Sequence, residues 1–155
     1  MDALELLRAQ HSEIQQRLLR IRTQSAVERR RELDDLSDAV EMHLLVEERH
    51  LEPLLHELSF DAVALKVETA RRLMARTVAE LRAIDAADPR FDATLSVLWA
   101  ELARHHDENE GRLFPALAGS LSQPLLRALG QSMLETIAEA ENDNWIGAAQ
   151  PDTSW

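Results

Sequence analysis

Cysteine is absent from this chain of 155 residues, and glycine occurs only four times. Without cysteine the protein can form no disulfide bond and can offer no thiolate to a metal ion or to a substrate. Any metal site must therefore use nitrogen and oxygen donors, a combination that suits iron, manganese or zinc. The sequence also contains no glycine-rich phosphate-binding loop and no Ser/His/Asp set. These absences argue against a metal-independent enzyme.

Acidic residues outnumber basic ones by 28 to 17, and no long hydrophobic run occurs. The formal net charge is -11, whereas surfaces that neutralise phosphates or anionic lipids need clustered Lys and Arg. The one basic cluster, "ERRRE" at 28–32, reads as a solvated helix face. No window approaches the roughly 20 apolar residues of a membrane span, and the acidic start "MDALELLRAQH" does not resemble a signal peptide. We expect a cytoplasmic protein that binds neither nucleic acid nor membranes.

The length allows one domain with a substantial core. Hydrophobic residues make up 45% of the chain and charged residues 29%, as in ordinary globular domains. Regular hydrophobic periods extend over most of the chain but not over its last residues. We therefore predict a single helical domain over residues 1–142 and a flexible C-terminal tail over residues 143–155.

Apolar residues recur at spacings of three and four, which is the pattern of amphipathic helices. The first predicted helix ends near Gln24 and Ser25, and the second runs from about Ala26 to Pro53, where proline should kink or end the helix. A third helix is followed by a loop that closes at Asp88–Pro89, and further helices begin near Phe91 and Ser122. No strand pattern appears, so the sequence predicts an all-α, up-down four-helix bundle with an additional C-terminal helix. The inner stripe of the first helix is predicted as Leu4, Leu7, His11, Ile14, Leu18 and Ile21, and that of the last as Leu125, Leu129, Met133 and Ile137.

An internal repeat links the second and fourth predicted helices. When Pro53 is aligned with Pro115, "HLLVEERHLEPLL" lies over "HHDENEGRLFPAL". The alignment matches His43 to His105. It also places Asn109 and the following residue, Glu110, opposite the glutamates of the first segment. The two helices therefore carry related local structures.

Histidine and glutamate occur four residues apart in both segments, a spacing that brings the two side chains together on one helix face. His43 and Glu47 have this spacing, as do His106 and Glu110. A single inward histidine, such as His11 alone, is more often a hydrogen-bonded core residue than a ligand. A buried carboxylate, however, requires a cationic partner, a water-filled cavity or a metal. With three helices contributing such residues, we interpret the set as a metal site.

Two alignments of the fourth helix disagree about its ligand. Pairing by proline favours His105, whereas the helical wheel puts His106 nearer the buried centre and in register with Glu110. Either histidine can complete the set.

These motifs, together with "QHSEI" on the first helix, resemble the hemerythrin-like, HHE-type cation-binding family. The resemblance covers about residues 3–118. It implies a four-helix bundle that holds a non-haem di-iron centre with bridging carboxylates, and roles in O2 binding, iron or O2 sensing, or repair of nitrosatively damaged iron centres. Carried over to this sequence, the implied ligands are His11, His43, Glu47, His105 or His106, and Glu110.

The sequence departs from the family pattern in two ways. The third helix normally supplies one or two histidines, but here Ala70 and Met74 occupy the expected positions. Asn109 stands where the second glutamate belongs. We therefore expect one tightly held metal, or an asymmetric pair with a labile member.

The leading functional hypothesis is a protein that binds iron, or manganese or zinc, and acts as an O2-, NO- or iron-responsive sensor, store or carrier. The alternative is a di-iron enzyme with oxidase, peroxidase or nitric-oxide chemistry, since an open coordination position allows reaction. A second alternative is a degenerate, metal-free scaffold that binds a partner. The sequence does not indicate an oligomeric state.

Overall fold

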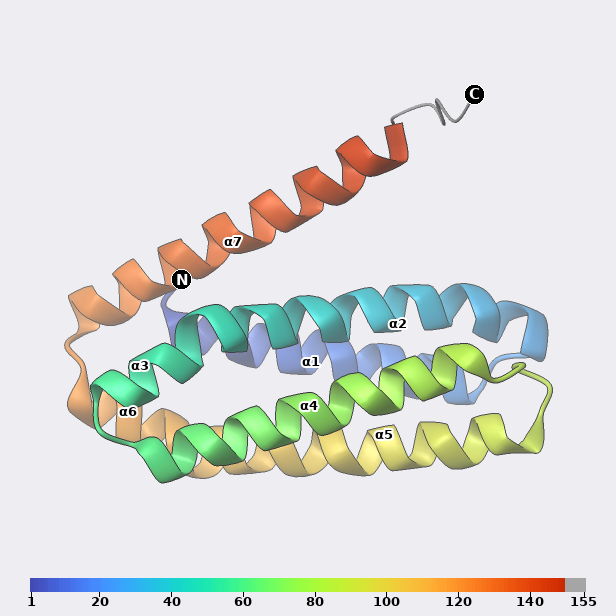
Figure 1. Ribbon diagram of the computed structural model, residues 1–155, viewed down its shortest axis with the longest axis horizontal. Helices are drawn as coiled ribbons and strands as arrows, with labels where there is room; N and C mark the ends of the chain where they lie inside the picture. Colours follow the sequence, from blue (N-terminus) through green and yellow to red (C-terminus); the bar gives the residue numbers. More distant parts are fainter. Residues whose placement is uncertain (150–155) are drawn as a thin grey trace.

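The computed structural model describes residues 1–149, with side chains described through Asp143 (Figure 1). Residues 1–149 form helices and contain no strand, as predicted for an all-α bundle. The long helices of the bundle are α1 (Ala3–Arg22), α2 (Ala26–Val46), α4 (Asp61–Ala83) and α5 (Pro89–Glu108). The remaining elements are the π-helical segments η1 (Glu47–Leu51) and η2 (Asn109–Leu113), and the helices α3 (Glu52–Glu57), α6 (Phe114–Ser120) and α7 (Gln123–Ala149).

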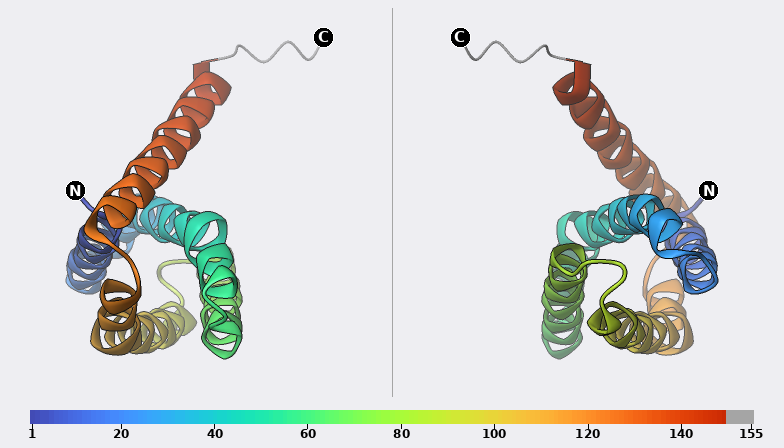
Figure 2. Two further views of the ribbon diagram at one scale, coloured as in Figure 1. Left: turned by 90° about the vertical axis from the view of Figure 1, so that its left-hand side faces the viewer. Right: turned by 90° about the vertical axis from the view of Figure 1, so that its right-hand side faces the viewer.

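The four long helices run alternately up and down and form a closed ring (Figure 2). Contacts join α1 to α2, α2 to α4, α4 to α5, and α5 back to α1. Helix α7 packs on α1 and α2 and then leads away from the bundle (Figure 1). None of the described helices is long and apolar enough to cross a membrane.

Local side-chain contacts fix the helix starts. Asp2 and Glu5 form a capping box at the start of α1, and Ser25 and Glu28 form another at the start of α2. Asp88 caps α5, whose first residue is Pro89. These signals are local, which is why the predicted start of the second helix at Ala26 agrees with the structure.

Two apolar clusters fill the bundle, one at each end. Leu7, Val46, Leu51 and Phe114 belong to the first cluster, near α3, α6 and α7. The second cluster, toward the α1–α2 and α4–α5 turns, includes Ile14, Leu18, Val40, Met74, Leu98 and Leu102. Along α1, α2 and α5, buried histidines lie between the residues of the two clusters. A polar layer thus separates the two halves of the core.

Pro53 was expected to kink or end the second helix, but the helix instead continues through a π-helical turn. This turn, η1, ends two residues before Pro53, and η2 ends two residues before Pro115. Proline donates no backbone hydrogen bond, and its ring would collide with the carbonyl four residues earlier in an α-helix. The wider turn just ahead of each proline accommodates this constraint, and the chain remains helical.

The inner stripe of α7 was predicted with one error. Leu125 is 57% exposed, and its neighbour Leu126 is buried instead, together with Met133. The helix also continues to Ala149, past Asn142, where the tail was expected to begin. The rest of that tail, residues 150–155, lies outside the described residues.

Helix α7 crosses the start of α1 at close backbone distance. A Cβ atom at Gly130 would lie 2.7 Å from the carbonyl oxygen of Met1 and 2.9 Å from the backbone nitrogen of Ala3. Only glycine allows this approach without a backbone shift.

Candidate metal centre

Four histidines from three helices converge in the polar layer. They are His11 of α1, His43 of α2, and His105 and His106 of α5, and none is more than 8% exposed. The rings of His11 and His106 are stacked, with centroids 3.8 Å apart. The centroid of His43 lies 4.7 Å from that of His11 and 6.0 Å from that of His105.

Glu47, at the start of η1, is fully buried beside these rings. Its Oε1 lies 2.9 Å from His43 Nε2 and 2.7 Å from His105 Nε2, and it accepts a 3.3 Å hydrogen bond from Asn109 Nδ2. Burial opposes the ionised carboxylate, but positive charge on His43 and His105 outweighs burial and holds the pKa of Glu47 well below its usual range. In turn, although burial favours neutral imidazole, Glu47 raises the pKa of His105.

The other two imidazoles are held neutral. Burial, followed by repulsion from His43 and His106, strongly lowers the pKa of His11. Burial and repulsion from His43 and His105 lower the pKa of His106 to about 3. Both rings are therefore neutral near pH 7, which is the form that coordinates a metal.

Several nitrogen and oxygen atoms of this layer that could bind a metal have no hydrogen-bond partner among the described residues. They are buried and include His11 Nε2, His106 Nε2 and Glu47 Oε2; His43 Nε2 also makes no hydrogen bond of acceptable geometry despite its proximity to Glu47. Buried polar atoms without partners cost free energy, and most native proteins satisfy them. A cation between these atoms would satisfy them together, so the residues present fit a metal ion.

The donors form two groups that share one residue. His11, His43 and His106 can place one donor atom each within 4.8 Å of one another, and so can His43, Glu47 and His105. The first group is built from imidazoles alone, and the second includes a carboxylate. His43 belongs to both groups.

Two further residues orient the imidazole rings. Gln10 Oε1 lies 2.8 Å from His43 Nδ1, and Glu110 Oε1 lies 3.3 Å from His11 Nδ1. Because these oxygens accept hydrogen bonds from Nδ1–H, the Nε2 lone pair of each ring is left for a metal. Sequence reasoning missed Gln10, since its partner lies on another helix and no spacing rule connects the two residues.

The structure brings most of the predicted site residues together. His11, His43 and Glu47 share the layer, and both His105 and His106 face inward, although the two alignments of the sequence each favoured one of them. Glu110 lies at the edge, with its side chain 40% exposed, and belongs to neither group of three donors. Asn109 instead faces the centre and is 4% exposed. The assignment of these residues as metal ligands remains a prediction.

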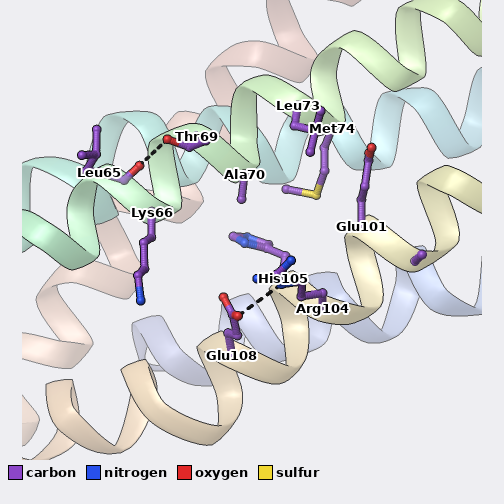
Figure 3. A pocket seen from close by; sticks show the side chains of 11 residues that line it. Leu65, Lys66, Thr69, Ala70, Leu73, Met74, Glu101, Arg104, His105 and Glu108 are labelled. Carbon is purple, nitrogen blue, oxygen red and sulfur yellow. Dashed lines mark hydrogen bonds and ion pairs between the residues drawn. The ribbon is translucent and has the colours of Figure 1, made fainter.

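The layer is open on the α4 side. Among the described residues, α4 supplies no member of either donor group. At this level of the bundle α4 presents Ala70 and Met74, which face His105 across a cavity of about 550 Å³ between α4 and α5 (Figure 3). The predicted absence of a third-helix ligand thus coincides with a cavity.

Comparison with known proteins agrees with this fold. A crystal structure of a hemerythrin HHE cation-binding domain-containing protein from Mycobacterium kansasii, a homologue of Rv2633c, has a similar fold, with a TM-score of 0.82 and 19% identity over 92% of this chain and 89% of that chain. No match was found among curated proteins. The family model of the hemerythrin HHE cation binding domain matches residues 2–117, which is most of the chain. The protein therefore belongs to the hemerythrin HHE cation-binding domain family.

Proposed function

We propose that this protein binds non-haem iron between α1, α2 and α5 and acts as an O2-, NO- or iron-responsive sensor, store or carrier. The observation that carries the proposal is the set of buried donor atoms without hydrogen-bond partners, His11 Nε2, His106 Nε2 and Glu47 Oε2, which point to a cation held in the polar layer. Membership of a cation-binding family supports a metal there.

The donor chemistry favours iron. Imidazoles with a carboxylate are typical ligands of non-haem iron in helical bundles, and manganese or zinc is also compatible with nitrogen and oxygen donors. Bound iron would supply reversible coordination of O2 or NO. The chain itself keeps His11 and His106 neutral, orients His43 and His11 through Gln10 and Glu110, and packs apolar clusters on both sides of the layer.

The cavity beside His105 favours a second candidate, an enzyme that uses the same centre for oxidase, peroxidase or nitric-oxide chemistry. A space of about 550 Å³ next to the donors could admit a co-substrate. A metal-free scaffold fits less well, because it would leave the buried donor atoms unsatisfied.

Metal analysis of protein purified without chelator tests the proposal directly. Elemental analysis should find iron at one or two atoms per chain, by analogy with mono- and di-nuclear sites in such bundles. Absorbance changes on adding O2, NO or peroxide then separate the candidates, because reversible changes without turnover indicate a sensor, store or carrier and sustained turnover indicates an enzyme. Protein that binds no metal even after incubation with ferrous iron would disprove the proposal.

A further inference from the structure

We propose that the cavity between α4 and α5 binds a small organic carboxylate, whose carboxylate group completes the metal centre at His105. This inference rests on the proposed function, since it assumes a metal in the polar layer. It goes further by naming the ligand that fills the open side of that layer.

The first argument is position. His105 belongs both to the cavity lining and to the donor group with His43 and Glu47, so the cavity adjoins the centre. Ala70 and Met74 form its α4 wall opposite His105 (Figure 3). A ligand in this space can reach the centre from the one side where the described residues supply no donor.

The second argument is size. Pockets of about 300 to 1,000 Å³ are typical of sites for organic ligands, whereas a water molecule occupies about 30 Å³. A diatomic gas would fill only a small part of the 550 Å³ cavity. Leu65 and Leu73, which line the cavity, are 62% and 47% exposed. An apolar body of several carbon atoms would cover these side chains.

The third argument is the charge of the donor set. Four imidazoles and a single carboxylate, Glu47, meet in the layer, so a divalent cation would retain excess positive charge there. The repeat places the neutral amide of Asn109 at the position that corresponds to Glu47. Excess charge in a buried site is costly, so an external carboxylate is the ligand class that best fits the open side of the layer.

The charges around the cavity are compatible with an anion. Lys66, the only lysine of the chain, lines the cavity and forms no ion pair with any residue that the structure describes. Of the two acidic lining residues, Glu108 pairs with Arg104 at 3.4 Å. Glu101 accepts a hydrogen bond from Thr77, and burial raises its pKa.

The test uses 4-fluorobenzoate as the probe and protein loaded with Zn²⁺, which is diamagnetic, so that binding is measured by fluorine NMR. Filling the cavity with Ala70→Phe should weaken binding by at least about tenfold, a loss of about 1.4 kcal/mol. Ala79→Phe is the matched control, because Ala79 is exposed on the same helix and does not line the cavity. Metal content is measured for every sample.

Two further comparisons test the role of the carboxylate. Uncharged 4-fluorobenzamide should bind about tenfold more weakly than 4-fluorobenzoate, and Asn109→Glu, which supplies a carboxylate from the chain, should weaken 4-fluorobenzoate by a similar factor. Equal affinities for the acid and the amide, or binding that Ala70→Phe and Asn109→Glu leave unchanged, would overturn the inference. Metal-loaded protein that binds no probe would overturn it as well but leave the proposed function intact, whereas protein that holds no metal would overturn both.

Discussion

The segments α2–η1–α3 and α5–η2–α6 have the same backbone design but different chemistry. In each, a histidine precedes a five-residue π-helical turn, and a proline follows that turn by two residues. The first segment begins its turn with Glu47, fully buried among imidazoles, and the second begins it with Asn109. The comparison teaches that the repeat preserves the path of the chain, while a single side chain decides how much negative charge each half gives to the centre.

Replacing His43 should have the largest effect, because His43 belongs to both donor groups, whereas its counterpart His105 belongs to one. His43→Ala is expected to reduce bound metal to near zero while helical circular dichroism stays largely intact. His56→Ala is the matched control, since His56 is an exposed histidine of α3. Metal content that does not change in His43→Ala would contradict the shared role of this residue.

His105 and His106 should differ in a second comparison. His105→Ala removes the donor group that contains Glu47, and His106→Ala removes the group built only from imidazoles. The loss of metal affinity should therefore be larger for His105→Ala, with each substitution costing at least roughly 10-fold, the lower end of the range for residues that only support a metal ligand. Competition with a chelator measures both. A larger effect of His106→Ala would show that Glu47 is not the dominant ligand.

Protonation of His105 should account for most of the metal release in acid. Because Glu47 raises the pKa of His105 above 6.5, a proton competes with metal there as pH falls toward and below neutrality. His11 and His106 stay neutral until far lower pH, so affinity should fall about tenfold per pH unit between pH 7 and 5. A steeper dependence, measured by metal retention across a pH series, would indicate that several histidines titrate together.

The same shifts affect the stability of the metal-free protein in opposite directions. Because the pKa values of His11 and His106 are lowered in the native state, the unfolded chain binds protons that the native state does not bind. Their contribution to the free energy of unfolding is therefore present above pH 6.5 and is lost as pH falls. The raised pKa of His105 contributes stability below pH 6.5 that is lost as pH rises through that pKa. Urea unfolding across pH should show a net loss toward acid.

Adding a ligand to α4 should have a smaller effect. Ala70 lines the cavity opposite His105, so Ala70→His is expected to raise metal stoichiometry or to slow metal loss to chelator by roughly tenfold. Ala79→His, on the exposed face of α4, controls for an added surface histidine. Wild-type protein that already holds two equally tight irons would refute the idea that this side is open.

The smallest expected effect concerns a contact that only the first half makes. His50 Nε2 lies 2.7 Å from Thr136 Oγ1 of α7, whereas the corresponding residue of the second half is Arg112. Thr136→Val keeps the shape of the side chain but removes this hydrogen bond, and should lower the free energy of unfolding by about 1 kcal/mol. Chemical denaturation measures the change, and a larger loss would mean that α7 contributes more to the bundle than this contact.

Hydrophobic spacing was sufficient to predict the bundle and much of the site. His11, His43 and Glu47 follow from three- and four-residue spacing, because their helices stay regular up to the polar layer. Tertiary contacts were not predictable in the same way. The partnership of Gln10 with His43 joins two helices, and the burial of Leu126 in place of Leu125 depends on how α7 docks against α1 rather than on its own period.

The sequence left His105 and His106 as alternatives for a geometric reason. Adjacent helical residues point about 100° apart, and the centre lies between them, so both rings reach it. The wheel had to select one residue because it assumed a single inward direction. It also extended a regular period through η2, where the turn widens.

Each π-helical turn changes the rotational phase of its helix. A π turn is equivalent to one residue inserted into an α-helix, and one residue corresponds to a rotation of about 100°. The residues before the turn can therefore aim at the polar layer, while Leu55 and Leu117, beyond it, aim at the apolar end of the core. If all five residues of either turn adopted α-helical geometry, the terminal part of the helix would rotate by about 100° away from the core, whereas deleting one residue would restore a regular α-helix whose terminal part keeps its direction.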